Sequence, residues 1–136
     1  MQRVLAVILL MAVSAGCAGS LKRTDSAETL AQYMGYAGEP VQGFFAPRVQ
    51  SWQPLARDRL ILWTGVNEAW LVTVWDTCTD LMFANVIGVT QTGSQVTTFD
   101  KVRVGRDRCP IRQIRPLDIR QMKADRAADA ASKPKP

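Results

Sequence analysis

Histidine is absent from the 136 residues of this chain. Its absence excludes Ser-His-Asp and Cys-His catalysis, zinc sites built on imidazole, and histidine pH switches. The chain also lacks a phosphate-binding loop and a dinucleotide fingerprint, so we predict no cofactor. The longest apolar run, 4–13, would rise about 15 Å as a helix, and the core of a bilayer is ~30 Å thick. The sequence therefore predicts neither an enzyme nor a membrane-spanning helix.

The N-terminal segment has the order of a secretory signal. A short positive start precedes the apolar run 4–13, and Ser14-Ala15-Gly16-Cys17 follows it. This ending resembles the lipobox of bacterial lipoproteins, in which the chain is cut before the cysteine and the cysteine is acylated. The pattern predicts a signal peptide over 1–16, lipidation at Cys17, and a lipidated cysteine with its tether over 17–24. An ordinary cleaved signal, leaving a free periplasmic protein, is the alternative.

These features predict a protein of the bacterial cell envelope that is attached to a membrane through its lipid anchor. Ala18 instead of aspartate follows Cys17, which by the usual lipoprotein rule fits the outer membrane, facing the periplasm, better than the inner membrane. A formal net charge of +5 is no nucleic-acid signature, and export separates the chain from the chromosome. We therefore predict no nucleic-acid partner, and expect an envelope protein or an anionic envelope polymer.

Cys78 and Cys109 are the two cysteines left after Cys17. An even pair in an exported protein indicates one disulfide, because that compartment is oxidising. Closing a loop of about 30 residues would stabilise the fold by roughly 3–4 kcal/mol in the chain-entropy model. Two free thiols, or one redox-active pair, are the competing interpretation, although no CxxC spacing is present to lower a thiol pKa.

Acidic residues offer weak candidates for metal binding or catalysis. The run 76–80 places oxygen ligands two residues apart, as a calcium loop does. Its sixth position is Leu81 instead of glycine and its twelfth is Ile87 instead of glutamate, so we predict no metal. A carboxylate-dependent hydrolase acting on envelope glycans stays open as the alternative function, because only spacing in the folded protein decides it. The candidate carboxylates for that reaction are Asp58, Glu68 and Asp100.

Helix signals lie at the two ends of the predicted domain. Asp25 and Glu28 form a capping-box pattern ahead of a short amphipathic helix. Pro116 and Asp118 suit the first turn of a last helix, the proline by its fixed backbone angle and the aspartate by its charge. Beyond the start of this last helix, few side chains could be buried against the rest of the domain. We therefore expect a frayed helix end and a disordered tail over 125–136.

Strand signals occupy 41–114. The strongest are 60–64 and 70–75, which are apolar on both faces and are joined by a loop that suits a hairpin. Strands apolar on both sides are typical of the centre of a sheet that is covered on both faces. We therefore expect Trp63 and Trp75, which lie in these two strands, to be part of the core.

The C-terminal third of the chain is basic. The alternation in 101–104 turns valines inward and basic side chains outward, where they could face phosphate or carboxylate groups. A solvated face, partly paired with Asp107 and Asp118, is the alternative. Trp52, beside Pro54 near a candidate sheet edge, is the aromatic residue best placed for a sugar or peptide ligand, with core packing as the alternative. The candidate anion-binding residues are Arg103, Arg106, Arg108, Arg112 and Arg115.

Five short motifs carry a resemblance to a known group: Ser51-Trp52-Gln53-Pro54, Leu62-Trp63-Thr64, Cys78 with Asp80-Leu81, Arg108-Cys109-Pro110-Ile111, and Ile114-Arg115-Pro116-Leu117-Asp118. Over about residues 40–122 the chain resembles small proteobacterial envelope lipoproteins that form a domain-of-unknown-function family. The resemblance implies an envelope lipoprotein in which Cys78 is paired with Cys109. It implies no activity and no catalytic residues.

The chain is thus expected to form a single small α+β domain over 25–124, preceded by the signal peptide. We predict an antiparallel sheet of about five to seven strands with an N-terminal and a C-terminal helix. The predicted function is that of a membrane-anchored envelope lipoprotein that acts as a non-catalytic binding or structural module.

Overall fold

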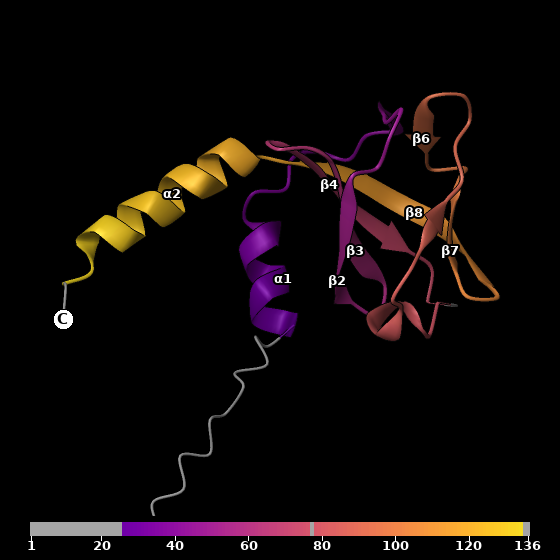
Figure 1. Cartoon of the computed structure of the whole chain (residues 1–136), viewed down its shortest axis with the longest axis horizontal. Coiled ribbons are helices and arrows are strands. Elements are labelled where there is room, and N and C mark those ends of the chain that lie inside the picture. Colours follow the sequence, from indigo (N-terminus) through magenta and orange to yellow (C-terminus); the bar gives the residue numbers. More distant parts are fainter. Residues whose placement is uncertain (1–25, 77, 135–136) are drawn as a thin grey trace, which may run out of the picture.

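The computed structural model describes residues 26–76 and 78–134. The predicted signal peptide, the predicted lipidation site Cys17 with its tether, and the predicted capping residue Asp25 lie outside these ranges. The described residues form helices at both ends and strands between them (Figure 1). The elements are α1 (Ser26–Met34), β1 (Gly43–Phe45), β2 (Ser51–Ala56), β3 (Arg59–Gly65), β4 (Glu68–Val74), the 3-10 turn η1 (Leu81–Phe83), β5 (Gly88–Val89), β6 (Gln95–Thr97), β7 (Lys101–Val104), β8 (Asp107–Leu117) and α2 (Ile119–Ser132).

The strands form two sheets. Six of them pair in the order β2-β3-β4-β8-β7-β5, and β1 pairs separately with β6. Every pairing is antiparallel. This architecture confirms the predicted α+β domain, with one helix before the strands and one after them.

The larger sheet curves around a buried apolar cluster. Leu62 of β3, Val72 of β4, Val102 of β7 and Ile114 of β8 all point into this cluster, and Phe44 of the small sheet closes it. Because β2 and β5 are the two edges of the sheet and residues around both line one shared hollow, the curvature brings the edges close together. The β1–β6 pair therefore covers the concave side of the sheet.

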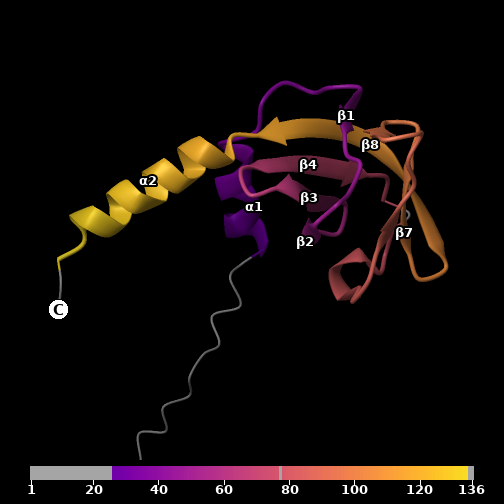
Figure 2. The same ribbon diagram turned by 45° about the horizontal axis from the view of Figure 1, so that its top comes forward.

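A second apolar cluster lies on the other face of β3 and β4. Ile61 and Leu71 point into it, and Tyr33 from α1 and Met122 from α2 cover them. In Figure 2, α1 lies beside these strands and α2 leads away from the end of β8. The apolar residues on both faces of the two central strands are thus used, one set in each cluster, as the sequence predicts.

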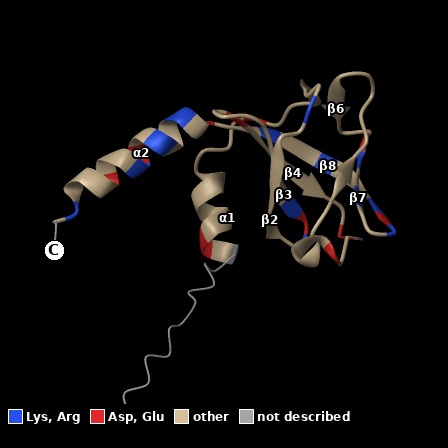
Figure 3. Cartoon of the chain, viewed as in Figure 1, with Lys and Arg blue, Asp and Glu red and all other residues tan. Residues whose placement is uncertain are grey.

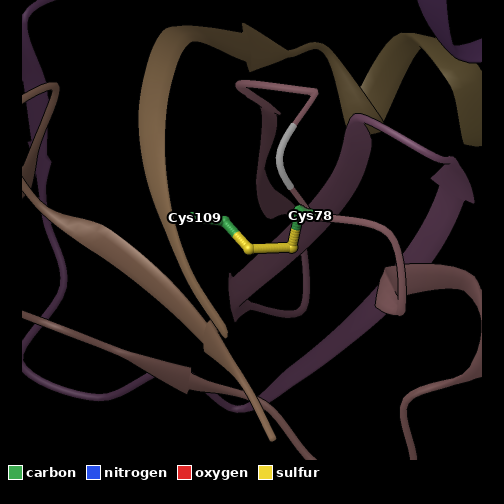
Figure 4. The surroundings of a disulfide bond; sticks show 2 residues. All are labelled: Cys78 and Cys109. Atoms are coloured by element: carbon green, nitrogen blue, oxygen red, sulfur yellow. A yellow bond between two sulfur atoms is a disulfide. The ribbon is translucent and has the colours of Figure 1, made fainter. Parts of the chain in front are cut away.

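Strand β8 joins the two halves of the larger sheet. Its residues 107–110 pair with β7, and its residues 111–117 pair with β4. Cys109 in the first half forms a disulfide with Cys78, with their Cα atoms 5.4 Å apart (Figure 4). Both half-cystines are buried in the interior cluster. The disulfide confirms the predicted pairing and holds β8 to the chain that leaves β4.

Helix α2 begins with a cap and ends far from the sheet. The Asp118 carboxylate accepts a hydrogen bond from the backbone N–H of Gln121, and Ile119 and Met122 are buried. The helix then continues to Ser132, through the region where we expected a frayed end. Five alanines between 124 and 131 explain the difference, because alanine has the highest helix propensity. None of the helices in the described ranges is long and apolar enough to span a membrane.

Candidate anion-binding surface

The β7–β8 hairpin carries most of the arginines selected from the sequence. Residues 101–104 alternate between exposed and buried, as predicted, so that Arg103 faces outward. The two strands are joined by the short turn Gly105-Arg106, and the φ of +57° at Gly105 lies in the left-handed region that favours glycine. This turn sets the register in which Arg103 lies directly opposite Arg108.

The facing pair of Arg103 and Arg108 brings like charges together. Like charges directly opposite each other on neighbouring strands destabilise a sheet. Asp118, which we considered as a possible ion-pair partner, caps α2 instead. Arg103 and Arg108 are both exposed. Two cations therefore face each other on an exposed part of the sheet.

A hollow of about 350 Å³ lies beside this pair. Phe99, with 89 % of its surface exposed, contributes an apolar wall. Figure 3 shows blue segments, which mark lysine and arginine, on both β7 and β8. We call this site the basic hollow, and its lining residues are Thr90, Phe99, Lys101, Arg103 and Arg108.

Arg112 lies further along β8 and contacts an exposed tryptophan. Its guanidinium carbon is 5.1 Å from the centre of the Trp75 ring, a distance typical of a cation–π contact. Trp75 is 52 % exposed, so our expectation that it belongs to the core is wrong. Trp75 directly follows Val74, the buried last residue of β4, and the alternation of side chains along a strand turns Trp75 to the opposite face.

Like Arg112, two further selected arginines do not line the basic hollow. Arg106 is exposed in the β7–β8 turn. Arg115 lies in the other half of β8, where its Nε donates to the backbone oxygen of Gly38 at 2.7 Å and a second guanidinium nitrogen donates to the oxygen of Ala37 at 3.5 Å. Arg115 thus holds the connection between α1 and β1, and its donors serve the fold.

Trp52 lies at the place where the two sheet edges come together. It is half-buried opposite Leu62, packs against the interior cluster, and lines a hollow of about 310 Å³. Gln91 lines the same hollow and donates from Nε2 to the backbone oxygen of Ala46 at 2.7 Å. The Trp52 hollow and the basic hollow are neighbours, because Gln91 lines the first and Thr90 lines the second.

A family model matches residues 1–133. The chain belongs to a family of unknown function (DUF6491). No curated protein and no solved structure matches the sequence. The family assignment agrees with the part of the sequence resemblance that implied a domain of unknown function, and it supplies no activity.

The carboxylates considered for hydrolysis are scattered in this family member. Asp58 is half-buried and Glu68 is exposed. Asp100 is buried, and its carboxylate accepts hydrogen bonds from the backbone and hydroxyl of Thr97 and from the hydroxyl of Thr90. None of these three acids lines the hollows described above. Among the described residues, no group of three or more acidic or cysteine side chains could hold a metal ion.

Sequence reasoning missed Phe99 and Thr90 as lining residues of the basic hollow. Phe99 falls within the region of strand signals, 41–114, but it lies in no strand of the structure. Strand β6 ends at Thr97 instead, because Asp100 accepts a hydrogen bond from the Thr97 N–H and turns the chain. An aspartate three residues after a threonine is the signal that could have indicated this turn.

Away from these hollows, one hydrogen bond shifts the pKa values of the two side chains that it joins. The hydroxyl of Tyr36 donates to the Asp125 carboxylate at 2.7 Å, and Gln121 donates to the same carboxylate at 2.7 Å. The hydrogen bond from Tyr36, followed by that from Gln121, lowers the pKa of Asp125. The same contact with Asp125 raises the pKa of Tyr36. The pair connects α2 to the residues that follow α1.

Proposed function

We propose that this protein is a lipid-anchored lipoprotein of the bacterial envelope that acts as a non-catalytic binding module. Its partner is an anionic envelope polymer, and the binding site is the basic hollow. The observation that carries the proposal is the direct cross-strand pairing of Arg103 with Arg108. The charge repulsion in that pair lowers the stability of the free protein, and a bound anion would relieve it.

The chemistry of the basic hollow suits an oxyanion on a larger molecule. A guanidinium presents parallel N–H donors that match phosphate or carboxylate, and two facing guanidinium groups can bind one such group from both sides. Lys101 adds a third cation and Phe99 adds an exposed apolar wall. A polymer that carries charged groups and sugar rings offers the charged groups to the three cations and the sugar rings to the Phe99 wall.

The proposed location rests on the N-terminal pattern and on the disulfide. The order of charge, apolar run and small residues before Cys17 is that of a lipoprotein signal. The buried Cys78–Cys109 bond is of the kind that persists in an oxidising compartment such as the periplasm. Ala18 after the lipidated cysteine favours the outer membrane, with the domain facing the periplasm.

Co-sedimentation and ligand capture test the binding site. The full-length protein is mixed with purified peptidoglycan sacculi in one arm, as a carboxylate-bearing probe, and with lipopolysaccharide in the other, as a phosphate-bearing probe. We expect binding in one arm that weakens with added salt and is lost in Arg103→Glu/Arg108→Glu. The matched control Arg57→Glu/Arg120→Glu changes the net charge equally at exposed positions outside the hollow. Equal losses in both double variants, or no binding in either arm, would overturn the assignment.

A separate experiment tests the anchor. Mass spectrometry of the mature N-terminal peptide should find an acylated Cys17, and fractionation should recover the protein with membranes. In Cys17→Ala the modification and the membrane association should both be lost. An unmodified peptide from the wild-type protein would contradict the anchor without affecting the binding experiment.

A further inference from the structure

The segment that follows the disulfide exposes two large apolar side chains. Phe83, at the end of η1, is 78 % exposed, and Val86 is 77 % exposed. Both line a hollow of about 330 Å³, together with Gly105 of the β7–β8 turn. Arg106 follows Gly105 and is exposed. This end of the domain thus presents apolar side chains beside a cation.

The same end of the domain also contains the start of helix α1. Met82, in η1, lines a hollow with Thr29, Gln32 and Tyr33 of α1. In Figures 1 and 2, the start of α1, η1 and the β7–β8 turn all lie at one end of the domain, and β6 lies at the opposite end. The exposed pair Phe83 and Val86 is therefore on the side from which the chain leads back toward Cys17.

Chain length limits how far this end can lie from an anchor at Cys17. Eight residues lie between Cys17 and Ser26, and the nine Cα–Cα steps that join the two residues span at most about 30 Å when fully extended. If Cys17 is acylated, the first turn of α1 is held within that distance of the lipid surface. On this side of the described fold lie η1, which shares a hollow with α1, and the β7–β8 turn, which shares a hollow with the segment after η1 (Figure 1).

We propose that Phe83 and Val86 insert into the interfacial region of the bilayer that holds the anchor, with Arg106 at the level of the lipid phosphates. This inference rests on the proposed lipid anchor. Apolar side chains flanked by a cation are typical of surfaces that lie in a membrane interface. Asp80 lines the same hollow and would be repelled by anionic lipid, so the contact is shallow. Insertion fixes the orientation of the domain and leaves the β6 end directed away from the membrane.

The four phenylalanines of the chain provide a direct test. The full-length protein is labelled with fluorophenylalanine and placed in bicelles of phosphatidylethanolamine and phosphatidylglycerol that carry a spin-labelled phospholipid. We expect selective broadening of the fluorine signal of Phe83. Phe99 is more exposed and follows β6, so its signal should stay sharp, as should that of the buried Phe44. Equal broadening of Phe83 and Phe99, or no broadening of Phe83, would overturn the proposal.

A matched pair of valine variants distinguishes insertion from nonspecific hydrophobic adsorption to the bicelle. Val86→Ser should reduce the broadening of Phe83. Val66→Ser should leave it unchanged, because Val66 is 76 % exposed but lies in the β3–β4 turn, where its backbone oxygen accepts from Lys123 of α2. The mass of the N-terminal peptide from the same sample reports whether Cys17 is acylated. The anchor and the insertion can therefore fail independently, each in its own measurement.

Discussion

The two halves of strand β8 use the same residue type for different purposes. In the first half, Arg108 faces Arg103 across the β7–β8 pair and borders the basic hollow. In the second half, Arg115 donates to backbone oxygens of the α1–β1 connection. Both side chains carry the same charge on the same strand. The difference is that the surroundings of Arg115 provide acceptors, whereas those of Arg108 provide another cation.

This comparison shows what distinguishes a candidate binding arginine from a structural one. A guanidinium whose donors are satisfied within the fold contributes to stability, and its loss leaves a carbonyl without its partner. A guanidinium held beside a like charge lowers stability until an anion binds. Stability measurements on variants of the two halves should therefore move in different directions.

The largest expected effect concerns the disulfide that holds the first half of β8 in place. Cys78→Ser/Cys109→Ser should lower the free energy of unfolding by about 3–4 kcal/mol, because a loop of this length is no longer closed in the unfolded chain. Urea unfolding followed by tryptophan fluorescence measures it. A double variant as stable as the wild type would show that β8 needs no covalent support.

The second prediction compares the two arginines directly. Arg115→Ala should cost about 1–2 kcal/mol, because the oxygens of Gly38 and Ala37 lose charged donors. Arg108→Ala should change stability by no more than about 0.5 kcal/mol, as is usual for exposed side chains, while removing anion binding. Arg115→Lys keeps the charge without the guanidinium fork and should be intermediate. Equal costs for the two alanine variants would contradict the division between the halves of β8.

A smaller effect tests the repulsion itself. Arg103→Gln removes one of the two facing charges and should stabilise the protein by up to about 0.5 kcal/mol at low ionic strength. The gain should disappear at high salt, because the Debye length shortens. Arg57→Gln, at an exposed position in the β2–β3 turn, is the control and should give no salt-dependent gain. Thermal unfolding at two salt concentrations measures both, and a gain that persists in salt would point to a cause other than charge.

The central hairpin could be predicted because both of its strands have a clear hydrophobic pattern. Residues 60–64 and 70–75 are apolar on both faces, and the two clusters on either side of β3 and β4 use both sets. The outward direction of Arg103 followed equally from the strict alternation in 101–104. Local periodicity thus determines which way a strand residue points when the neighbouring residues follow the same alternation of apolar and polar side chains.

The extent of β8 could not be predicted in the same way. Pro116 was expected to begin a helix, yet β8 runs through Pro116 as well as through Pro110. A proline lacks the N–H but keeps its carbonyl, and these carbonyls accept hydrogen bonds from the N–H groups of Trp75 and Gly38. The contact that permits each proline comes from a segment distant in sequence. The same holds for Arg115, whose acceptors lie before β1.

The smallest effect concerns the contact that connects α2 to the chain after α1. The pKa of Asp125 is lowered from 3.8 by its hydrogen bonds with Tyr36 and Gln121, so its stabilisation is present above that ordinary pKa and is lost as the pH falls through the folded-state value. The pKa of Tyr36 is raised from 10.0. The stabilisation that the Tyr36 hydroxyl contributes is therefore present below pH 10 and is lost as the pH rises through the folded-state pKa. Tyr36→Phe should move the pKa of Asp125 up toward its ordinary value, and an NMR titration of the Asp125 carboxyl carbon measures the shift. If Asp125 titrates unchanged in Tyr36→Phe, the hydrogen bond does not hold α2 in solution.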